Sequence, residues 1–290
     1  MIYLVFPTSW HPSQPYLSLP SLKAFLNMHG VHDVIQRDLA IELLNDLCTW
    51  EKTKPLYERI IRELNELSSK PRLTQEEGEK FNKLREAEEI VMALKDQIDA
   101  AVASQRSQEF YEIDQYMENL KIMDVWLDNI LAPYYPSQLT VIGSQMRFSP
   151  YSSQEVIDSF KHPEENFFYD LYQQWYLPDI LKEDIDILGI SITSVEQIIS
   201  GLTLAYLVKQ HRPEIHITVG GSVFTKLVDR LESQGSHLFD FVDSFVVHEG
   251  ETPLLRLVEQ LRGDRDLSKV PNLIYKKDGE VKVNRPFAKE

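Results

Sequence analysis

Small and polar residues that could hold a ligand follow three consecutive apolar runs between positions 185 and 251. Hydroxyl groups donate and accept hydrogen bonds, and glycines let a ligand lie against the backbone because no Cβ is in the way. The residues at these positions are Ser191, Thr193, Ser194, Gly220, Gly221, Glu249, Gly250 and Glu251. Their types suit the binding of a ligand, and none of them is predicted to be catalytic.

The three apolar runs are typical of strands, and a helical pattern follows each one. Residues 185–192 are almost all aliphatic, as expected for a central strand buried on both faces. Shorter strands are predicted over 215–219 and 241–247, and Thr252 is expected to cap the helix that follows the last of them. Because the carboxyl ends of parallel strands share one edge of a sheet, the predicted site lies at that edge.

A fourth predicted strand spans residues 2–6, and a proline-rich loop follows it over residues 7–20. Long loops after a first strand are often functional. A short helix over 21–29 and a strand over 31–39 then complete a strand–helix–strand unit. The loop contributes these residues to the predicted site: Pro7, Thr8, Ser9 and Trp10, with His11 as a candidate metal ligand.

These five strands, with helices between them, predict a doubly wound (Rossmann- or flavodoxin-like) α/β fold. The expected architecture is a five-stranded parallel sheet in the order 2-1-3-4-5, with a large helical insertion and a C-terminal β-hairpin around Asp278-Gly279. The predicted ligand-binding domain combines residues 1–39 and 184–263. Residues 40–183 form the insertion, and residues 264–290 form the hairpin and a linker.

The insertion is predicted to contain an antiparallel helical hairpin over residues 41–131, with a capping box from Thr74 to Glu77. This segment carries 20 Asp and Glu residues against 12 Lys and Arg residues. Such a surface suits either a solvated arm or a docking surface for a partner. The aromatic helix expected over 167–175 suits either ordinary packing or a cover for a flat ligand.

Composition excludes several classes of function. The net charge of −15 argues against nucleic acid as a partner, since phosphate binding needs a basic surface. No apolar run is long enough to span a membrane, and the N-terminus lacks the basic region of a signal peptide, so a cytoplasmic protein is expected. Cys48 is the single cysteine and cannot form an internal disulfide or a thiolate metal cluster by itself.

Nucleotide-binding and zinc-binding signatures are missing from the sequence. No GxGxxG motif follows the first strand, and no GxxxxGK[ST] motif occurs anywhere. No spacing of His, Cys and Glu suits zinc. The predicted ligand is therefore one that does not depend on a phosphate-cradling loop.

Three motifs together resemble a known family. LGISITS at 188–194, ITVGG at 217–221 and EGE at 249–251 are similar to the N-terminal cobalamin-binding domain of cobalamin-dependent radical S-adenosylmethionine enzymes. In that family a Ser-x-Thr and a Gly-Gly flank a channel for the nucleotide tail of the cofactor. Here they are Ser191-Ile-Thr193 and Gly220-Gly221, separated by the 26 residues from Ser194 to Val219.

The resemblance implies a cobalamin-binding function, with the tail buried at the carboxyl edge of the sheet and Gly201 leaving room beside it. It implies a partner core, in cis or in trans, that holds an iron–sulfur cluster and S-adenosylmethionine, and residues 264–290 resemble the linker that leads to such a core. The whole enzyme would be methyltransferase-like, acting on a substrate that the sequence does not identify. This chain alone is expected to bind rather than catalyse.

The chain departs from the family and its relatives at three places. The Asp-x-His-x-x-Gly motif of other cobalamin proteins is replaced by PTSWHPSQP, so His11 is the only candidate cobalt ligand in that loop. The CxxxCxxC motif of the radical core is absent. His248 stands where the family has the first glycine of Gly-Glu-Gly-Glu.

Three alternatives remain open. The predicted site residues also fit structural roles, with Ser194 as a helix N-cap and Gly220-Gly221 as a plain strand-to-helix turn. The sheet also suits a flavodoxin-like module that binds a flavin or another small cofactor. The third alternative is an interaction protein in which the acidic helical hairpin binds the partner.

Overall fold

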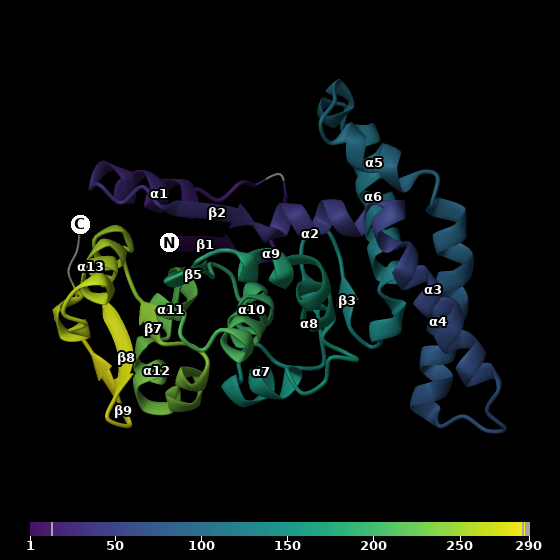
Figure 1. Cartoon of the computed structure of the whole chain (residues 1–290). Coiled ribbons are helices and arrows are strands. Elements are labelled where there is room, and N and C mark those ends of the chain that lie inside the picture. Colours follow the sequence, from purple (N-terminus) through teal and green to yellow (C-terminus); the bar gives the residue numbers. More distant parts are fainter. Residues whose placement is uncertain (13, 286, 288–290) are drawn as a thin grey trace.

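The computed structural model describes residues 1–12, 14–285 and 287, and the end of the predicted linker, residues 286 and 288–290, lies outside this part. Figure 1 shows an α/β body with a group of helices on one side of it. Within the described residues the body contains a seven-stranded sheet in the order β2-β1-β5-β6-β7-β8-β9. The strands are β1 (Ile2–Phe6), β2 (Val34–Asp38), β5 (Ile187–Ser191), β6 (His216–Gly220), β7 (Ser244–Val246), β8 (Leu273–Lys277) and β9 (Glu280–Val283).

The first five strands in this order are parallel, which agrees with the predicted order. The prediction of a separate five-stranded sheet was wrong in one respect. Strand β8 pairs antiparallel with β7, so the C-terminal hairpin extends the sheet to seven strands and makes it mixed. The pairing covers the β7 edge, which would otherwise expose unpaired backbone groups.

Helices cover both faces of the sheet. Helices α1 (Ser18–Met28) and α13 (Glu251–Arg262) pack on one face, where Leu19 and Leu254 meet Leu4 of β1. Helices α10 (Gln197–His211), α11 (Ser222–Lys226) and α12 (Val228–Gln234) contribute to the other face, together with Val5. Alternate side chains of each strand therefore enter two separate apolar clusters, as the pleat requires.

The first part of the insertion forms a group of helices, which we call the arm. It consists of α3 (Trp50–Ser68), α4 (Gln75–Leu94), α5 (Ile98–Ser104) and α6 (Ile113–Ile130), joined to the sheet through α2 (Leu39–Leu47) (Figure 1). The predicted capping box of α4 is confirmed, since Glu77 N donates to Thr74 Oγ1 and Thr74 N donates to Glu77 Oε2. The indole of Trp126 donates to Leu47 O at 2.7 Å, and this buried bond ties α6 to α2.

A short strand, β3 (Gln138–Leu139), pairs with β4 (Ser144–Gln145) outside the main sheet. Two helix caps differ from those considered from the sequence. Helix α13 begins at Glu251, with Gly250 at the N-cap, so Thr252 lies inside the helix. Helix α10 has Glu196 at its N-cap, so Ser194 is not the cap.

The aromatic segment is helical and buried. It contains α8 (Phe167–Leu171), a π-helical turn over Tyr172–Tyr176 and α9 (Leu177–Lys182). Phe167 and Phe168 are fully buried in the main core between the arm and α10. Ordinary packing therefore accounts for these aromatic rings. None of the helices in the described part of the chain combines the length and the apolar composition of a membrane span.

A partly buried histidine at the start of β6, His216, should make stability depend on pH. Burial lowers the pKa of His216 to about 4 from an ordinary value of 6.5. The unfolded chain therefore binds a proton more readily, so the contribution of neutral His216 is complete above pH 6.5 and is lost as the pH falls towards 4. We expect this loss to be on the order of 2–3 kcal/mol of the free energy of unfolding.

Urea unfolding of the wild type and of His216→Gln at pH 7, 6 and 5 measures this contribution. The wild type should lose more stability than His216→Gln over this range, while exposed His29→Gln should follow the wild type. Parallel pH profiles for the wild type and His216→Gln would show that His216 does not control this dependence.

Candidate functional site

A cavity of about 830 Å³ opens at the carboxyl edge of the sheet, on the face covered by α1 and α13. We call this cavity the slot. Leu4 of β1, Gly189 of β5 and Thr218 of β6 form its floor and lie side by side in register. Ser18 and Leu22 of α1 and Leu254 of α13 contribute to its walls. A ligand in the slot would lie between the sheet and two helices.

The glycine at position 189 makes room for the side chain of Leu4 in the slot floor. A Cβ at this position would come within 2.8 Å of Leu4 Cδ2 and 3.9 Å of Thr218 Cγ2. A side chain at position 189 would therefore displace Leu4 from the floor. The prediction did not include Gly189, although a glycine inside an otherwise aliphatic strand is a recognised mark of close approach by another group.

A chain of hydrogen bonds orients the hydroxyl of Thr218 on the slot floor. Ser244 Oγ donates to Thr218 Oγ1 at 3.0 Å, and His216 Nε2 lies 2.9 Å from Ser244 Oγ. Because the single Ser244 proton is used on Thr218, neutral His216 donates its Nε2–H to Ser244. The Thr218 hydroxyl can then donate its own proton to an acceptor in the slot.

Seven of the predicted residues line the slot. They come from three strand ends that are distant in sequence: Ser191, Thr193, Gly220, Gly221, Glu249, Gly250 and Glu251. The Ser191 hydroxyl donates to Ser18 Oγ at 3.0 Å and so joins β5 to the start of α1. Hydroxyls, glycine backbone and carboxylates therefore meet at one opening, as the sequence predicted.

The two adjacent glycines serve different purposes. Gly221 has φ +114°, and a Cβ on it would lie 2.0 Å from the carbonyl oxygen of Ile192. Its missing side chain therefore permits close contact between two backbone segments. Gly220 has ordinary φ, and a Cβ there would meet its nearest neighbour, Val246 O, at 3.5 Å. The backbone at Gly220 would therefore tolerate a side chain, whereas the backbone at Gly221 would not.

The first half of the loop after β1 is anchored away from the slot. Thr8 is buried and its hydroxyl lies 3.0 Å from the hydroxyl of Tyr172, whose pKa burial raises to about 12. Ser9 Oγ donates to Ser144 Oγ at 3.1 Å. Trp10 packs edge-on against Phe6, with ring centroids 5.8 Å apart. None of the residues 7–11, which include Pro7 and His11, is among the described residues that line the slot.

The amide of Gln197 holds this loop against the end of β5. Its Nε2 donates to Pro7 O at 2.9 Å, and its Oε1 accepts from Thr193 N, Thr193 Oγ1 and Ser194 N at 2.9, 3.0 and 3.2 Å. Gly201 lies one turn further along α10, where a Cβ would meet Ile192 Cδ1 at 2.6 Å. Gly201 and Ser194 therefore belong to the packing around α10 and lie outside the slot.

The second half of the same loop lines the slot and was missed by the prediction. Pro15, Tyr16, Leu17 and Ser18 take the positions that were assigned to residues 7–10. Tyr16 stacks on Phe6, with ring centroids 5.5 Å apart. Helix α1 begins at Ser18 rather than at residue 21, so these residues lie at the start of the helix. The apolar and aromatic side chains of this segment were the sequence signal that could have indicated its place in the site.

His248 adopts the backbone conformation of a glycine. Its φ of +60° lies in the left-handed region, which a residue with a Cβ rarely occupies. Its backbone N–H donates to Thr225 Oγ1 at 2.8 Å. The loop before α13 therefore retains a turn suited to glycine, although the residue at position 248 carries a side chain.

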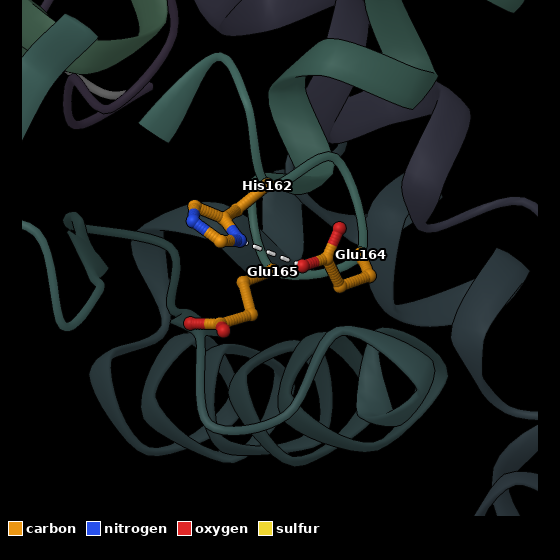
Figure 2. A group of neighbouring side chains, drawn as sticks. All are labelled: His162, Glu164 and Glu165. Carbon is orange, nitrogen blue, oxygen red and sulfur yellow. Dashed lines mark hydrogen bonds and ion pairs between the residues drawn. The ribbon is translucent and has the colours of Figure 1, made fainter. Parts of the chain in front are cut away.

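A separate group of potential metal ligands lies in the loop between α7 (Ser153–Ser159) and α8. Figure 2 shows His162, Glu164 and Glu165, whose ligand atoms lie within 4.8 Å of one another. His162 Nδ1 lies 2.8 Å from Glu164 Oε1, and Arg147 Nε lies 2.7 Å from Glu165 Oε2. Because a guanidinium already neutralises the buried Glu165 carboxylate, this group fits an ion-paired loop better than a cation site.

Comparisons with known proteins gave no match. No family model, no curated protein and no solved structure matches this chain. The geometry of the slot and the motif resemblance are therefore the basis for a functional proposal.

The contact between Gly221 and Ile192 can be tested by substitution. Gly221→Ala should reduce the free energy of unfolding by more than about 3 kcal/mol, because it adds a backbone clash to the strain of positive φ. Gly279 also has positive φ, at +82°, but nothing lies within 4 Å of a Cβ there. Gly279→Ala should therefore cost only about 1 kcal/mol.

Denaturant unfolding monitored by circular dichroism compares the two variants. Equal destabilisation would show that the position of Ile192 does not constrain Gly221.

Proposed function

We propose that this chain binds cobalamin and that the slot takes the nucleotide tail of the cofactor. The seven-stranded mixed sheet would then be a variant of the doubly wound, Rossmann-like fold, with the ligand at the carboxyl edge. The observation that carries the proposal is the slot itself. It lies where Ser191 and Gly220, the residues of the motif resemblance, meet the glycine floor at Gly189.

The lining of the slot fits the chemistry of such a tail. A flat base needs a narrow apolar space, and Leu4, Gly189 and Leu254 provide it. A base nitrogen needs a donor, and the oriented hydroxyl of Thr218 provides one. A phosphate needs a cation, and Lys226 is the one lysine or arginine among the described residues that line the slot.

The proposal assigns positioning to this chain and the reaction to the cofactor. Bound cobalamin would supply cobalt chemistry such as methyl transfer, and the protein would hold and orient it. A protein ligand to cobalt is not required, because the loop after β1 lacks Asp-x-His-x-x-Gly and His11 lies outside the slot lining. The predicted radical core, with its iron–sulfur cluster and S-adenosylmethionine, would be a partner in cis or in trans.

Cys48 does not supply a reactive thiolate to this chemistry. It is fully buried, and burial raises the pKa of its thiol well above the usual range. A buried neutral thiol is a poor nucleophile and a poor metal ligand. The proposed function of this chain is therefore cofactor binding, and a methyltransferase-like reaction would need the partner core.

Titration with hydroxocobalamin tests the proposal. Gel filtration and the corrin spectrum should show binding by the wild type. Ser21 is exposed and lines the slot, so Ser21→Trp should block the opening without disturbing the core and should weaken binding at least about tenfold. Ser233→Trp, on the exposed surface of α12, is the matched control and should bind as the wild type does.

Two results would contradict this proposal. Failure of the folded wild type to retain hydroxocobalamin would exclude cobalamin as the ligand. Equal binding by Ser21→Trp and the wild type would place the cofactor elsewhere. A yellow chromophore that copurifies with the protein would favour the alternative of a flavin-binding module.

A second candidate function, partner docking, is favoured by an exposed apolar cluster on the arm. Tyr111, Ile113 and Met117 are 77%, 75% and 58% exposed and lie within seven residues of one another. The charged residues between positions 107 and 120 are all acidic: Glu109, Glu112, Asp114 and Glu118. Apolar side chains within an acidic rim complement a partner segment that is amphipathic and basic.

The triple variant Tyr111→Ser/Ile113→Ser/Met117→Ser tests this docking role. Binding of a basic amphipathic model peptide, measured by fluorescence anisotropy, should fall at least about tenfold because the apolar contacts are removed. Met28 is 83% exposed on α1 at a distance in sequence from this cluster, and Met28→Ser serves as the control. Unchanged peptide binding by the triple variant would exclude the cluster as the docking surface.

A further inference from the structure

A second cavity, of about 370 Å³, lies beside the slot on the opposite side of the sheet. We call it the apolar pocket. Its walls come from α10, α11, α12 and the loop before α7, and its apolar residues belong to the main core rather than to the cluster under α1. Several of its apolar side chains are buried: Val156, Ile198, Leu202, Phe224, Leu231 and Leu238.

The size and lining of the apolar pocket suit the apolar body of a small molecule. Its volume is at the lower end of the range for small-molecule sites. An unfilled cavity lined by aliphatic groups leaves its lining without dispersion contacts on one side, so an apolar ligand would gain contacts that the protein alone lacks. Tyr151 lines the same cavity with an aromatic ring that is 77% exposed, which places this ring at the opening.

The charged side chains that line the apolar pocket are both positive, although the protein is acidic overall. Arg230 and Lys226 both line the apolar pocket and are exposed. Among the described residues neither forms an ion pair, and no Asp or Glu lines the pocket. In a chain of net charge −15, a cavity with two cations and no carboxylate selects for an anion.

We propose that the apolar pocket is a second ligand site, for an amphipathic anion whose apolar body enters the core and whose acidic group pairs with Arg230. A medium-chain carboxylate and an aromatic sulfonate share this chemistry. The site does not depend on the identity of the ligand in the slot. It is nevertheless adjacent to the slot, because Thr193, Ser222 and Lys226 line both cavities. Ser222 Oγ donates to Thr193 O at 2.9 Å. Arg230 lines the apolar pocket alone and is therefore the cation assigned to it.

Fluorescence of 1-anilinonaphthalene-8-sulfonate, followed by displacement with decanoate and with decanol, tests this site. Arg230→Glu should weaken the affinity for decanoate at least about fivefold, because the carboxylate loses its cationic partner. The affinity for decanol should stay within about twofold of the wild-type value, because decanol has no acidic group. Arg85→Glu, an exposed residue of α4, is the control with the same change in net charge and should leave both unchanged. Ser21→Trp, which blocks the slot, should also leave both unchanged.

A bulky substitution at the rim tests the place of binding. Val195 is partly exposed and lines the apolar pocket, so Val195→Trp should abolish binding of the sulfonate and of decanoate. Methyl NMR of the wild type gives an independent readout, since decanoate should shift the methyl signals of Ile198, Leu202 and Leu231. Equal decanoate affinities for Arg230→Glu and the wild type, or shifts confined to residues outside the apolar pocket, would overturn the proposal.

Discussion

The carboxyl edge of the sheet depends on the buried amide of Gln197. This one side chain accepts from the end of β5 and donates to Pro7 O, at the end of β1 and 190 residues away in sequence. Both ends of the amide are used inside the protein, where an unpaired polar group would be costly. These hydrogen bonds of Gln197 fix the loop after β1 and the loop after β5 in one position. The edges of the slot and of the apolar pocket are therefore set by a hydrogen-bonded scaffold before any ligand binds.

The close contact of Gly221 with Ile192 completes this scaffold and separates the two cavities. Ile192 N donates to Gly220 O at 2.8 Å, so the chain after β5 continues to pair with β6 as it leaves the sheet. The slot lies on the α1 side of this contact, and the apolar pocket lies on the α10 side. Glycines at the strand ends line the first together with hydroxyl and apolar side chains, whereas buried apolar side chains of the main core line much of the second. The ends of β5 and β6 thus border two cavities with different chemical environments.

The sequence predicted the elements with clear local signals and missed those that depend on distant contacts. The apolar runs that end in Ser191 and Gly220 were recognisable as parallel strands whose ends converge. The capping box at Thr74 is equally local, and it was confirmed. In contrast, the role of Gly189 follows from its register with Leu4 and Thr218, which no local pattern specifies. The pairing of β8 with β7 is likewise a long-range contact, and it made the sheet larger than predicted.

The loop after β1 shows why residue type alone did not identify the lining of the slot. Thr8 has a hydroxyl that suits a ligand, but a buried Tyr172 supplied by the insertion takes its hydrogen bond. Gly201 has the open backbone that suits a ligand, but Ile192 and Pro7 fill the space above it. A polar or small residue is available to a ligand only when distant parts of the chain do not cover it. Residues 15–18 line the slot because the hydrogen bonds of Gln197 draw the first half of the loop towards α10 and leave the second half beside the slot.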